Sequence, residues 1–298
     1  MALPILKTWR SYFEQSPHEG LGSSYERVVL NLKLEQLRTR YGISTCLEAP
    51  VFGFTGLTGI NSMGLARRGV RVTLVDDHRE RLGLINSAWA QAGERFTGVC
   101  VQDFTALPFA DKSFDLSWNF SAVWFVSDIQ RLLEELTRVT RKVIFLCVPN
   151  RWGIGFFLDK YISVPELRGK LKEENFSPGK LNRHMNPLGW SLAESGYIDV
   201  PPWPDIGMKK EEFLKRLGLA FLVKNRQDKS SPPLTIMNYY MGTDPDFVAR
   251  MLRHYWVERK LPMMIKTIWA HHRYLLFSPK ATLGRSKNGG PQSLSYLC

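Results

Sequence analysis

Four acidic or polar side chains each follow an apolar, strand-like run in the first half of the chain: Glu48, Asp76, Asp103 and Asn119. In an open parallel sheet the carboxyl ends of the strands meet at one edge, and ligands bind there. A carboxylate after the second strand is the usual device for holding a ribose diol, because it accepts both hydroxyl protons. The pattern therefore indicates a ligand that contains a ribose, a feature that dinucleotide enzymes share.

A glycine-containing loop, EAPVFGFTGLTGINS over residues 48–62, separates the first strand from the first helix. Glycine lets the backbone approach a ligand without a Cβ in the way. Gly53, Gly56 and Gly59 are spaced by three residues, and Pro50 precedes them. We interpret the segment as a modified ligand-binding loop, with an ordinary glycine-rich turn between strand and helix as the alternative.

Alternating strands and helices must position these residues. Hydrophobic patterning predicts strands over 44–49, 70–76, 96–103, 113–120 and 141–150, and helices over 61–69, 78–93 and 128–140. This alternation is typical of an α/β fold with a doubly wound, mostly parallel sheet. The run over 141–150 is almost continuously apolar, as expected for a strand buried on both faces.

The regular alternation ends after residue 150. There the pattern predicts a helix over 186–196, a strand over 197–205, helices over 244–270 with a break at Pro262, and a last strand over 271–280. The expected organisation is an N-terminal helical segment (1–44), a ligand-binding core (45–150), and the rest of the sheet with substrate-cap insertions (151–280). A disordered tail (281–298) follows, because it is polar and rich in glycine.

Three motifs in the core resemble those of class I S-adenosylmethionine-dependent methyltransferases, most closely the ubiquinone and menaquinone methyltransferase branch. The matching residues are Asp103, Leu107, Pro108 and Phe109, then Ser113, Phe114 and Asp115, then Glu135, Leu136, Arg138 and Val139. The resemblance covers residues 45–150 and extends weakly to 190–200 and 272–280. It implies a seven-stranded Rossmann-like sheet and S-adenosylmethionine as the cofactor.

The resemblance also implies roles for individual residues. Glu48 would lie near the methionine moiety, Asp76 with Asp77 near the ribose, and Asp103 with Phe104 near the adenine. Asn119 and Phe120 would face the methyl group and the acceptor. The family places its last glycine six residues after the acid, whereas Gly59 here follows Glu48 by eleven, and Pro50 replaces the first glycine.

A general base for the acceptor is less clearly indicated. His184 precedes a predicted helix, and a neutral imidazole suits this role near neutral pH. His18, His271 and His272 are rivals, and each alternatively serves packing or the surface. Methyl transfer to a good nucleophile depends mainly on alignment, so that a strong base is not required.

Charge and cysteine content bound the partners. Residues 205–298 carry 16 Lys and Arg against 7 Asp and Glu, so most of the net charge of +12 lies there. Such a region fits nucleic acid, an anionic membrane surface or a solvated face. The four cysteines lack metal-ligand spacing, and we expect no metal site. With no apolar run long enough to span a membrane and no signal-peptide pattern, we expect a cytoplasmic protein.

We therefore expect a methyltransferase acting on a small or lipophilic acceptor, with peripheral membrane contact left open. The helical stripe of Phe247, Val248, Met251, Leu252 and Tyr255 either faces the core or forms a membrane-surface lid. RNA or protein methylation and a non-catalytic, cofactor-binding scaffold are the alternatives. A nicotinamide dehydrogenase is disfavoured by the glycine spacing. The sequence does not indicate the oligomeric state.

Overall fold

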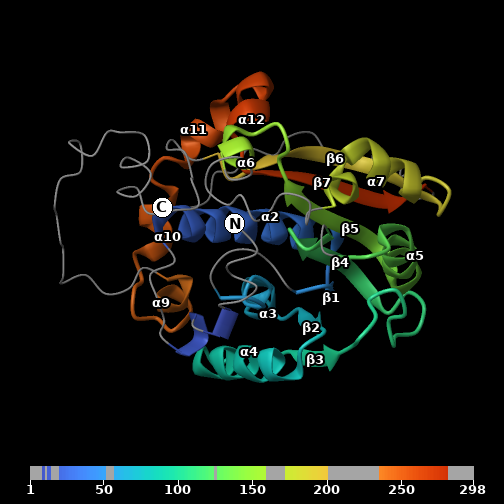
Figure 1. The fold of residues 1–298 in the computed structure, drawn as a ribbon. Coiled ribbons are helices and arrows are strands. Elements are labelled where there is room, and N and C mark those ends of the chain that lie inside the picture. The colour runs from blue at the N-terminus through green and yellow to red at the C-terminus, as the bar shows by residue number, and fades with distance from the viewer. Residues whose placement is uncertain are drawn as a thin grey trace.

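A computed structural model describes residues 9–10, 12–14, 20–51, 57–123, 126–158, 172–200 and 235–280. These residues form a seven-stranded sheet with the strand order β3-β2-β1-β4-β5-β7-β6 (Figure 1). The strands are β1 (Thr45–Glu48), β2 (Arg71–Asp76), β3 (Thr97–Cys100), β4 (Phe114–Phe120), β5 (Thr140–Pro149), β6 (Trp190–Ile198) and β7 (His272–Pro279). The expected α/β class and seven-stranded, mostly parallel sheet are confirmed.

The direction of each strand follows from its pairing. β1 to β5 pair in parallel, whereas β7 lies antiparallel between β5 and β6. β1 pairs with β2 on one side and with β4 on the other. Successive strands are therefore added in one direction from β1 to β3 and in the opposite direction from β4 onward, so the strand order reverses between β1 and β4. In an open α/β sheet, ligands bind at such a reversal, beyond the carboxyl ends of the strands.

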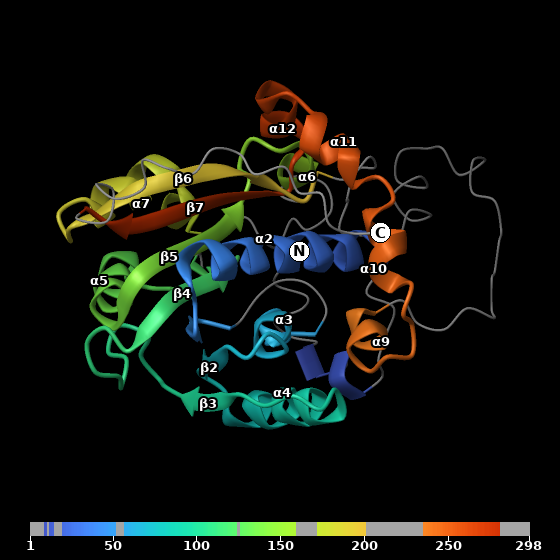
Figure 2. The same ribbon diagram turned by 180° about the vertical axis from the view of Figure 1, so that it is seen from behind.

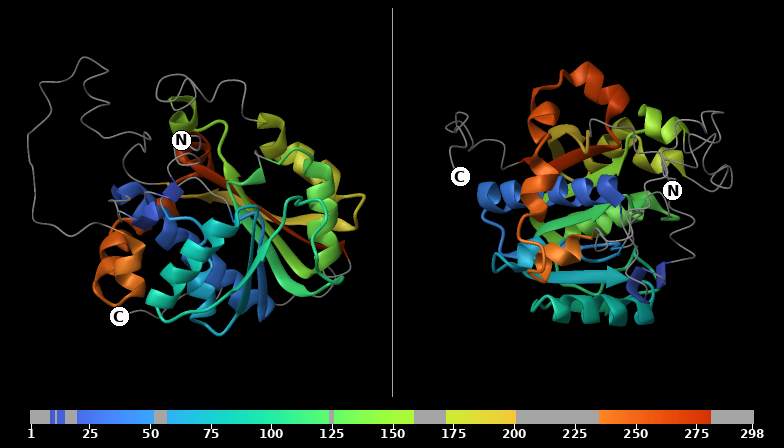
Figure 3. Two further views of the ribbon diagram at one scale, coloured as in Figure 1. Left: turned by 60° about the horizontal axis from the view of Figure 1, so that its bottom comes forward. Right: turned by 90° about the vertical axis from the view of Figure 1, so that its left-hand side faces the viewer.

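Helices cover both faces of this sheet (Figures 2 and 3). One face packs against α2 (Gly20–Tyr41), α3 (Met63–Ala66), α4 (Arg79–Gln91), α9 (Ile236–Tyr240) and α10 (Phe247–Leu252). The other packs against α5 (Ile129–Val139), the 3-10 helix η4 (Glu173–Phe176) and α7 (Pro178–Met185). The remaining described helices are α6 (Ile154–Leu158), α11 (Tyr255–Lys260) and α12 (Met263–Trp269). Two hydrophobic clusters therefore enclose the central strands.

The stripe on residues 247–255 faces the core. Phe247 and Met251 are buried in the cluster that contains α2, and the other three members of the stripe are partly buried against it. The helical region ends at Leu261, and α12 begins after Pro262, as expected from the missing amide hydrogen of proline. The predicted tail over 281–298 lies outside the described residues.

The predicted helix over 186–196 is wrong. Residues 190–198 instead form β6, which pairs antiparallel with β7 from Trp190 opposite Pro279 to Ile198 opposite His272. The crossover helix is α7, which lies before this segment, and Gly189 with a φ of +81° separates the two elements. A register shift between Leu192 and Glu194 spoils the strict alternation that would have identified a strand. Pairing with β7 overrides the local helical pattern.

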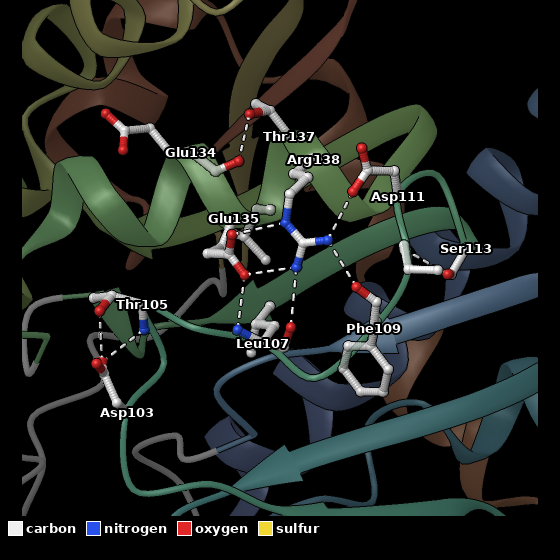
Figure 4. Close-up of polar contacts among 12 residues, drawn as sticks. Asp103, Thr105, Leu107, Phe109, Asp111, Ser113, Glu134, Glu135, Thr137 and Arg138 are labelled. Atoms are coloured by element: carbon white, nitrogen blue, oxygen red, sulfur yellow. Dashed lines mark hydrogen bonds and ion pairs between the residues drawn. The ribbon is translucent and has the colours of Figure 1, made fainter.

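A polar clamp holds the loop between β3 and β4 against α5 (Figure 4). Arg138 donates to the carbonyls of Phe109 at 2.7 Å and Leu107 at 3.0 Å, and its guanidinium pairs with Glu135 and Asp111. Glu135 accepts the backbone N–H of Leu107 at 2.7 Å. These contacts explain why Leu107, Phe109, Glu135 and Arg138 occur together in the sequence: they fix the loop that follows Asp103.

Replacing Arg138 by alanine should remove this clamp and leave two carbonyls and Glu135 without their donor. We expect a loss of about 1–2 kcal/mol in the free energy of unfolding, measured by urea titration. Arg131→Ala is the matched control, because Arg131 is exposed and its ion pair with Asp128 is long, at 3.7 Å; its effect should stay within about 0.5 kcal/mol. Equal losses in both variants would contradict the assignment of the clamp.

Candidate functional site

The sheet brings three of the predicted site residues to one edge. Glu48 ends β1, Asp76 ends β2, and Asn119 is the penultimate residue of β4. Because these strands are parallel neighbours, their carboxyl ends lie side by side at the reversal of strand order. All three side chains are buried. Backbone N–H groups of Ala49 and Val51 continue the ladder by donating to Trp118 and Val75.

Glu48 belongs to a buried hydrogen-bond chain. Ser62 donates its hydroxyl to Glu48 Oε2 at 2.5 Å, and the indole N–H of Trp118 donates to the same hydroxyl at 3.0 Å. Burial raises the pKa of Glu48 to about 8, although Ser62 and the charge of Arg27 oppose this shift. A carboxyl group in this state can hold a proton near neutral pH and release it when a cation approaches.

Arg27 connects α2 to the loop that follows β1. Its side chain is buried and donates to the carbonyl of Leu57 at 2.8 Å and to the side-chain oxygen of Asn61 at 2.7 Å. These two residues lie on either side of Gly59, so Arg27 fixes the second half of the loop. The sequence signal for this role is a charged residue, Arg27, between the buried apolar residues Tyr25 and Val28 of α2. Arg27 was not among the predicted site residues.

Asp76 is already engaged by protein groups. Arg81 of α4 contacts both carboxylate oxygens, with Nε at 2.7 Å from Oδ2, and also pairs with Asp77. The backbone N–H of His78 donates to Asp76 at 2.8 Å. Burial raises the pKa of Asp76, and Arg81 opposes that rise. Trp9 stacks over the Arg81 guanidinium at 5.5 Å, so that an N-terminal side chain covers the pair.

Gly59 has a packing role in the described structure. Its φ is +70°, and an added Cβ would lie 2.6 Å from the side chain of Ile85 on α4. Its carbonyl accepts the indole N–H of Trp89 at 2.8 Å. The positive φ and the contact with α4 explain this glycine without a ligand. Gly53 and Gly56 lie outside the described residues. The Ala49–Pro50 peptide bond is cis.

The predicted adenine-side residues lie beyond β3. Asp103 follows the last residue of β3 by three positions and is exposed, and it accepts from the hydroxyl and backbone N–H of Thr105. These two bonds lower its pKa. Phe104 beside it is half-buried, and Asp77 is exposed. The turn leaves Asp103 open to solvent at the loop that the Arg138 clamp fixes.

Asn119 and Phe120 face two different groups. The amide nitrogen of Asn119 lies 3.4 Å from the carbonyl of Ala49, and its Oδ1 has no hydrogen-bond partner among the described residues. Phe120 packs its ring on His272, with centroids 4.5 Å apart. A buried acceptor without a partner, next to the acids on β1 and β2, fits a polar ligand at this edge.

The structure does not bring His184 to this edge. β7 is antiparallel to β5 and β6 is antiparallel to β7, so β6 begins at the edge where the parallel strands begin. His184 lies at the end of α7, six residues before Trp190 opens β6. His184 therefore lies near the edge where the parallel strands begin, whereas Glu48 and Asp76 lie at the edge where they end. Of its rivals, His272 is the one that contacts Phe120.

Comparison with known proteins gives the class of domain. Residues 54–147 match the family model described as "Methyltransferase domain". A 66-residue stretch is 44% identical to a malonyl-[acyl-carrier protein] O-methyltransferase of Erwinia billingiae, covering 22% of this chain. The chain spans about a quarter of the length of that curated relative, 26%. The residues that match the family model include β2, β3, β4 and most of β5 of the seven-stranded sheet.

Solved structures with a similar arrangement are distant in sequence. A protein described as a sarcosine dimethylglycine methyltransferase from Galdieria sulphuraria is 18% identical, with 83% of this chain and 84% of that chain covered and a TM-score of 0.48. Magnesium protoporphyrin IX methyltransferase from Synechocystis, with bound S-adenosylhomocysteine, is 16% identical over 58% of this chain and 77% of that chain, with a TM-score of 0.45. With such low identities and TM-scores, neither carries an argument about the acceptor.

The site predicts how stability depends on pH. The unfolded chain loses the Glu48 proton near pH 4.5, whereas the folded protein keeps it to about pH 8. Between these values the folded state binds more protons, so stability falls as the pH rises, by up to about 1.4 kcal/mol per pH unit. Glu48→Gln should remove this part of the decline, measured as the free energy of unfolding at pH 6 and pH 8.

Glu35→Gln is the control for this experiment. Arg38 lowers the pKa of Glu35, so its titration lies below the pH range that is compared. The decline between pH 6 and pH 8 should be the same in Glu35→Gln as in the native protein. An unchanged decline in Glu48→Gln would show that Glu48 titrates normally in the folded protein.

Proposed function

We propose that the protein is an S-adenosylmethionine-dependent methyltransferase that acts on a small or lipophilic acceptor. The observation that carries the proposal is the placement of Glu48 and Asp76 on adjacent parallel strands at the reversal of strand order. In this proposal Glu48 faces the ammonium of the methionine moiety, and Asp76 accepts hydrogen bonds from the ribose. The exposed Asp103 lies on the adenine side with Phe104, and Gly53 and Gly56 complete the loop.

The cofactor supplies a methyl group on a positively charged sulfur. Glu48 and Asp76 would hold the cofactor, which would supply the methyl group to a lone pair of the acceptor and leave as S-adenosylhomocysteine. We assign Asn119, whose Oδ1 has no partner among the described residues, and Phe120 to the acceptor side. The chain's contribution is alignment of the acceptor in line with the breaking bond, worth several powers of ten in rate.

A lipophilic acceptor is supported by an exposed apolar surface on α6, α11 and α12, which we name the apolar cap. Its large side chains are Trp152, Ile154, Trp256, Met263, Met264, Ile265 and Ile268. Met264 is 83% exposed. Lys260 lies 5.8 Å from the ring centroid of Trp256, so cationic and apolar groups are interleaved. This combination is typical of surfaces that bind anionic lipid. No helix among the described residues is long and apolar enough to cross a bilayer.

A non-catalytic role is the second candidate, because Arg81 occupies both oxygens of Asp76. A ribose would have to displace Arg81 or share the carboxylate with it. This candidate is a scaffold that binds the cofactor and transfers no methyl group. Methylation of RNA or protein by the basic C-terminal third stays an alternative function. We also propose a cytoplasmic location.

Cofactor binding tests the proposed site, and transfer of a labelled methyl group to a component of a cell extract distinguishes the first two candidates. The native protein should bind both S-adenosylmethionine and S-adenosylhomocysteine in calorimetry, and Asp76→Asn should bind at least about tenfold more weakly through the loss of a charged hydrogen-bond acceptor. Asp246→Asn, at an exposed position that makes no side-chain cap bond, is the control. The absence of binding by the native protein would refute the proposed function. Labelled cofactor with fractionated cell extract would then reveal the acceptor.

Vesicle sedimentation tests the lipophilic part of the proposal. The native protein should sediment with phosphatidylcholine vesicles that contain phosphatidylglycerol and much less with phosphatidylcholine alone, because the cationic groups need an anionic surface. The double variant Met264→Glu, Ile268→Glu should lose most of this binding. Met241→Glu places one glutamate at an exposed apolar residue next to α9, outside the apolar cap. This control should retain vesicle binding. Equal sedimentation of both variants would rule out the apolar cap as the contact surface.

A further inference from the structure

A second polar cluster lies on the acceptor side of the sheet, away from Glu48 and Asp76. It contains Glu26 of α2, Asp199 directly after β6, and His272, the first residue of β7. Ile198 pairs with His272 in the β6–β7 ladder, so the two strands bring Asp199 and His272 together by their register. All three residues are buried. Phe120 covers His272 from the end of β4.

His272 lies close to both carboxylates, and ligand atoms of all three residues lie within 4.8 Å of one another. His272 Nδ1 lies 3.4 Å from Glu26 Oε2 and 3.9 Å from Asp199 Oδ2. Carboxylate and imidazole ligands bind a first-row divalent cation at about 2.0–2.2 Å, so two atoms that share such an ion are at most about 4.4 Å apart. Both distances from His272 satisfy this limit.

Two buried atoms in the cluster have no hydrogen-bond partner among the described residues. They are His272 Nδ1, in a side chain that is 10% exposed, and Asp199 Oδ1, in a side chain that is fully buried. Buried polar atoms of native proteins are paired in the great majority of cases, so two orphans at one place require an explanation. His272 Nδ1 lies within 4 Å of two carboxylates without forming a hydrogen bond to either.

We propose that Glu26, Asp199 and His272 bind a divalent first-row transition cation of the Mn²⁺, Fe²⁺ or Zn²⁺ type. Two carboxylates and one imidazole suit these ions, whereas Mg²⁺ and Ca²⁺ prefer oxygen ligands alone. Three protein ligands leave further coordination positions open. The proposal differs from the expectation from sequence that the chain has no metal site, and it does not depend on the proposed methyltransferase activity.

The surroundings agree with this assignment. His271 bonds to Asp199 Oδ2 at 2.7 Å and so orients the carboxylate whose Oδ2 lies 3.9 Å from His272 Nδ1. Metal-binding carboxylates are commonly held in this way by a neighbouring hydrogen bond.

More negative charge lies close by. Glu258 accepts from the Tyr25 hydroxyl at 2.7 Å and from the backbone N–H of Val200, which is the residue after Asp199. The second of these bonds holds the chain directly after Asp199, next to the end of β6.

The test uses untagged, full-length protein treated with a chelator and then titrated with Mn²⁺ or Zn²⁺ in a calorimeter. We expect one ion per chain. Asp199→Asn and Glu26→Gln, which keep the side-chain volume, and His272→Ala should each weaken binding at least 100-fold. His271→Ala should weaken it by roughly 10- to 100-fold, as for a group that orients a ligand. The Co²⁺-loaded native protein should show visible d–d absorption from an ion ligated by His272. This absorption should be absent from His272→Ala.

His254→Ala is the control, because His254 is exposed and makes no side-chain cap bond to α11. It should bind the ion as the native protein does. If His272→Ala does not fold, the two volume-conserving variants decide the question. No binding by the native protein, or unchanged binding by Asp199→Asn and Glu26→Gln, would overturn the proposal.

Discussion

One buried cation, Arg27, fixes the loop beside Glu48 at the edge where the parallel strands end. A guanidinium inside a helix–sheet interface is tolerated only because its donors find acceptors, and here these are the carbonyl of Leu57 and the side chain of Asn61. The same charge opposes the burial-driven rise in the pKa of Glu48. Loop geometry and carboxyl ionisation at this edge therefore depend on α2, a helix that precedes the core strands in sequence.

The placement of polar side chains at one edge was predictable from the sequence, because the carboxyl ends of parallel strands lie side by side. Glu48, Asp76 and Asn119 each followed a β-branched or apolar run, and the fold necessarily placed them together. The motif residues Leu107, Glu135 and Arg138 were likewise recognisable, since the backbone of one loop and the side chains of one helix form the clamp. Here local pattern and tertiary structure agree.

Other features depended on contacts that the sequence pattern does not indicate. The pairing of Arg81 with Asp76 joins a helix to the strand before it, and nothing in the sequence distinguishes Arg81 from Arg79. The strand β6 was mistaken for a helix because its partner β7 lies some eighty residues later in the chain. His184 was selected by residue type alone, and only the antiparallel arrangement of β6 and β7 reveals its distance from the site.

Glu26 and Arg27 are neighbours on α2, yet Glu26 contacts His272 whereas Arg27 contacts the loop after β1. Successive residues of a helix project about 100° apart, so one turn of α2 supplies a carboxylate to the His272 cluster and a guanidinium to the loop after β1. A rigid helix that contributes to both cannot rotate or slide for one without disturbing the other. Ligands at the two places would thus influence each other's affinity, and to an equal degree in each direction.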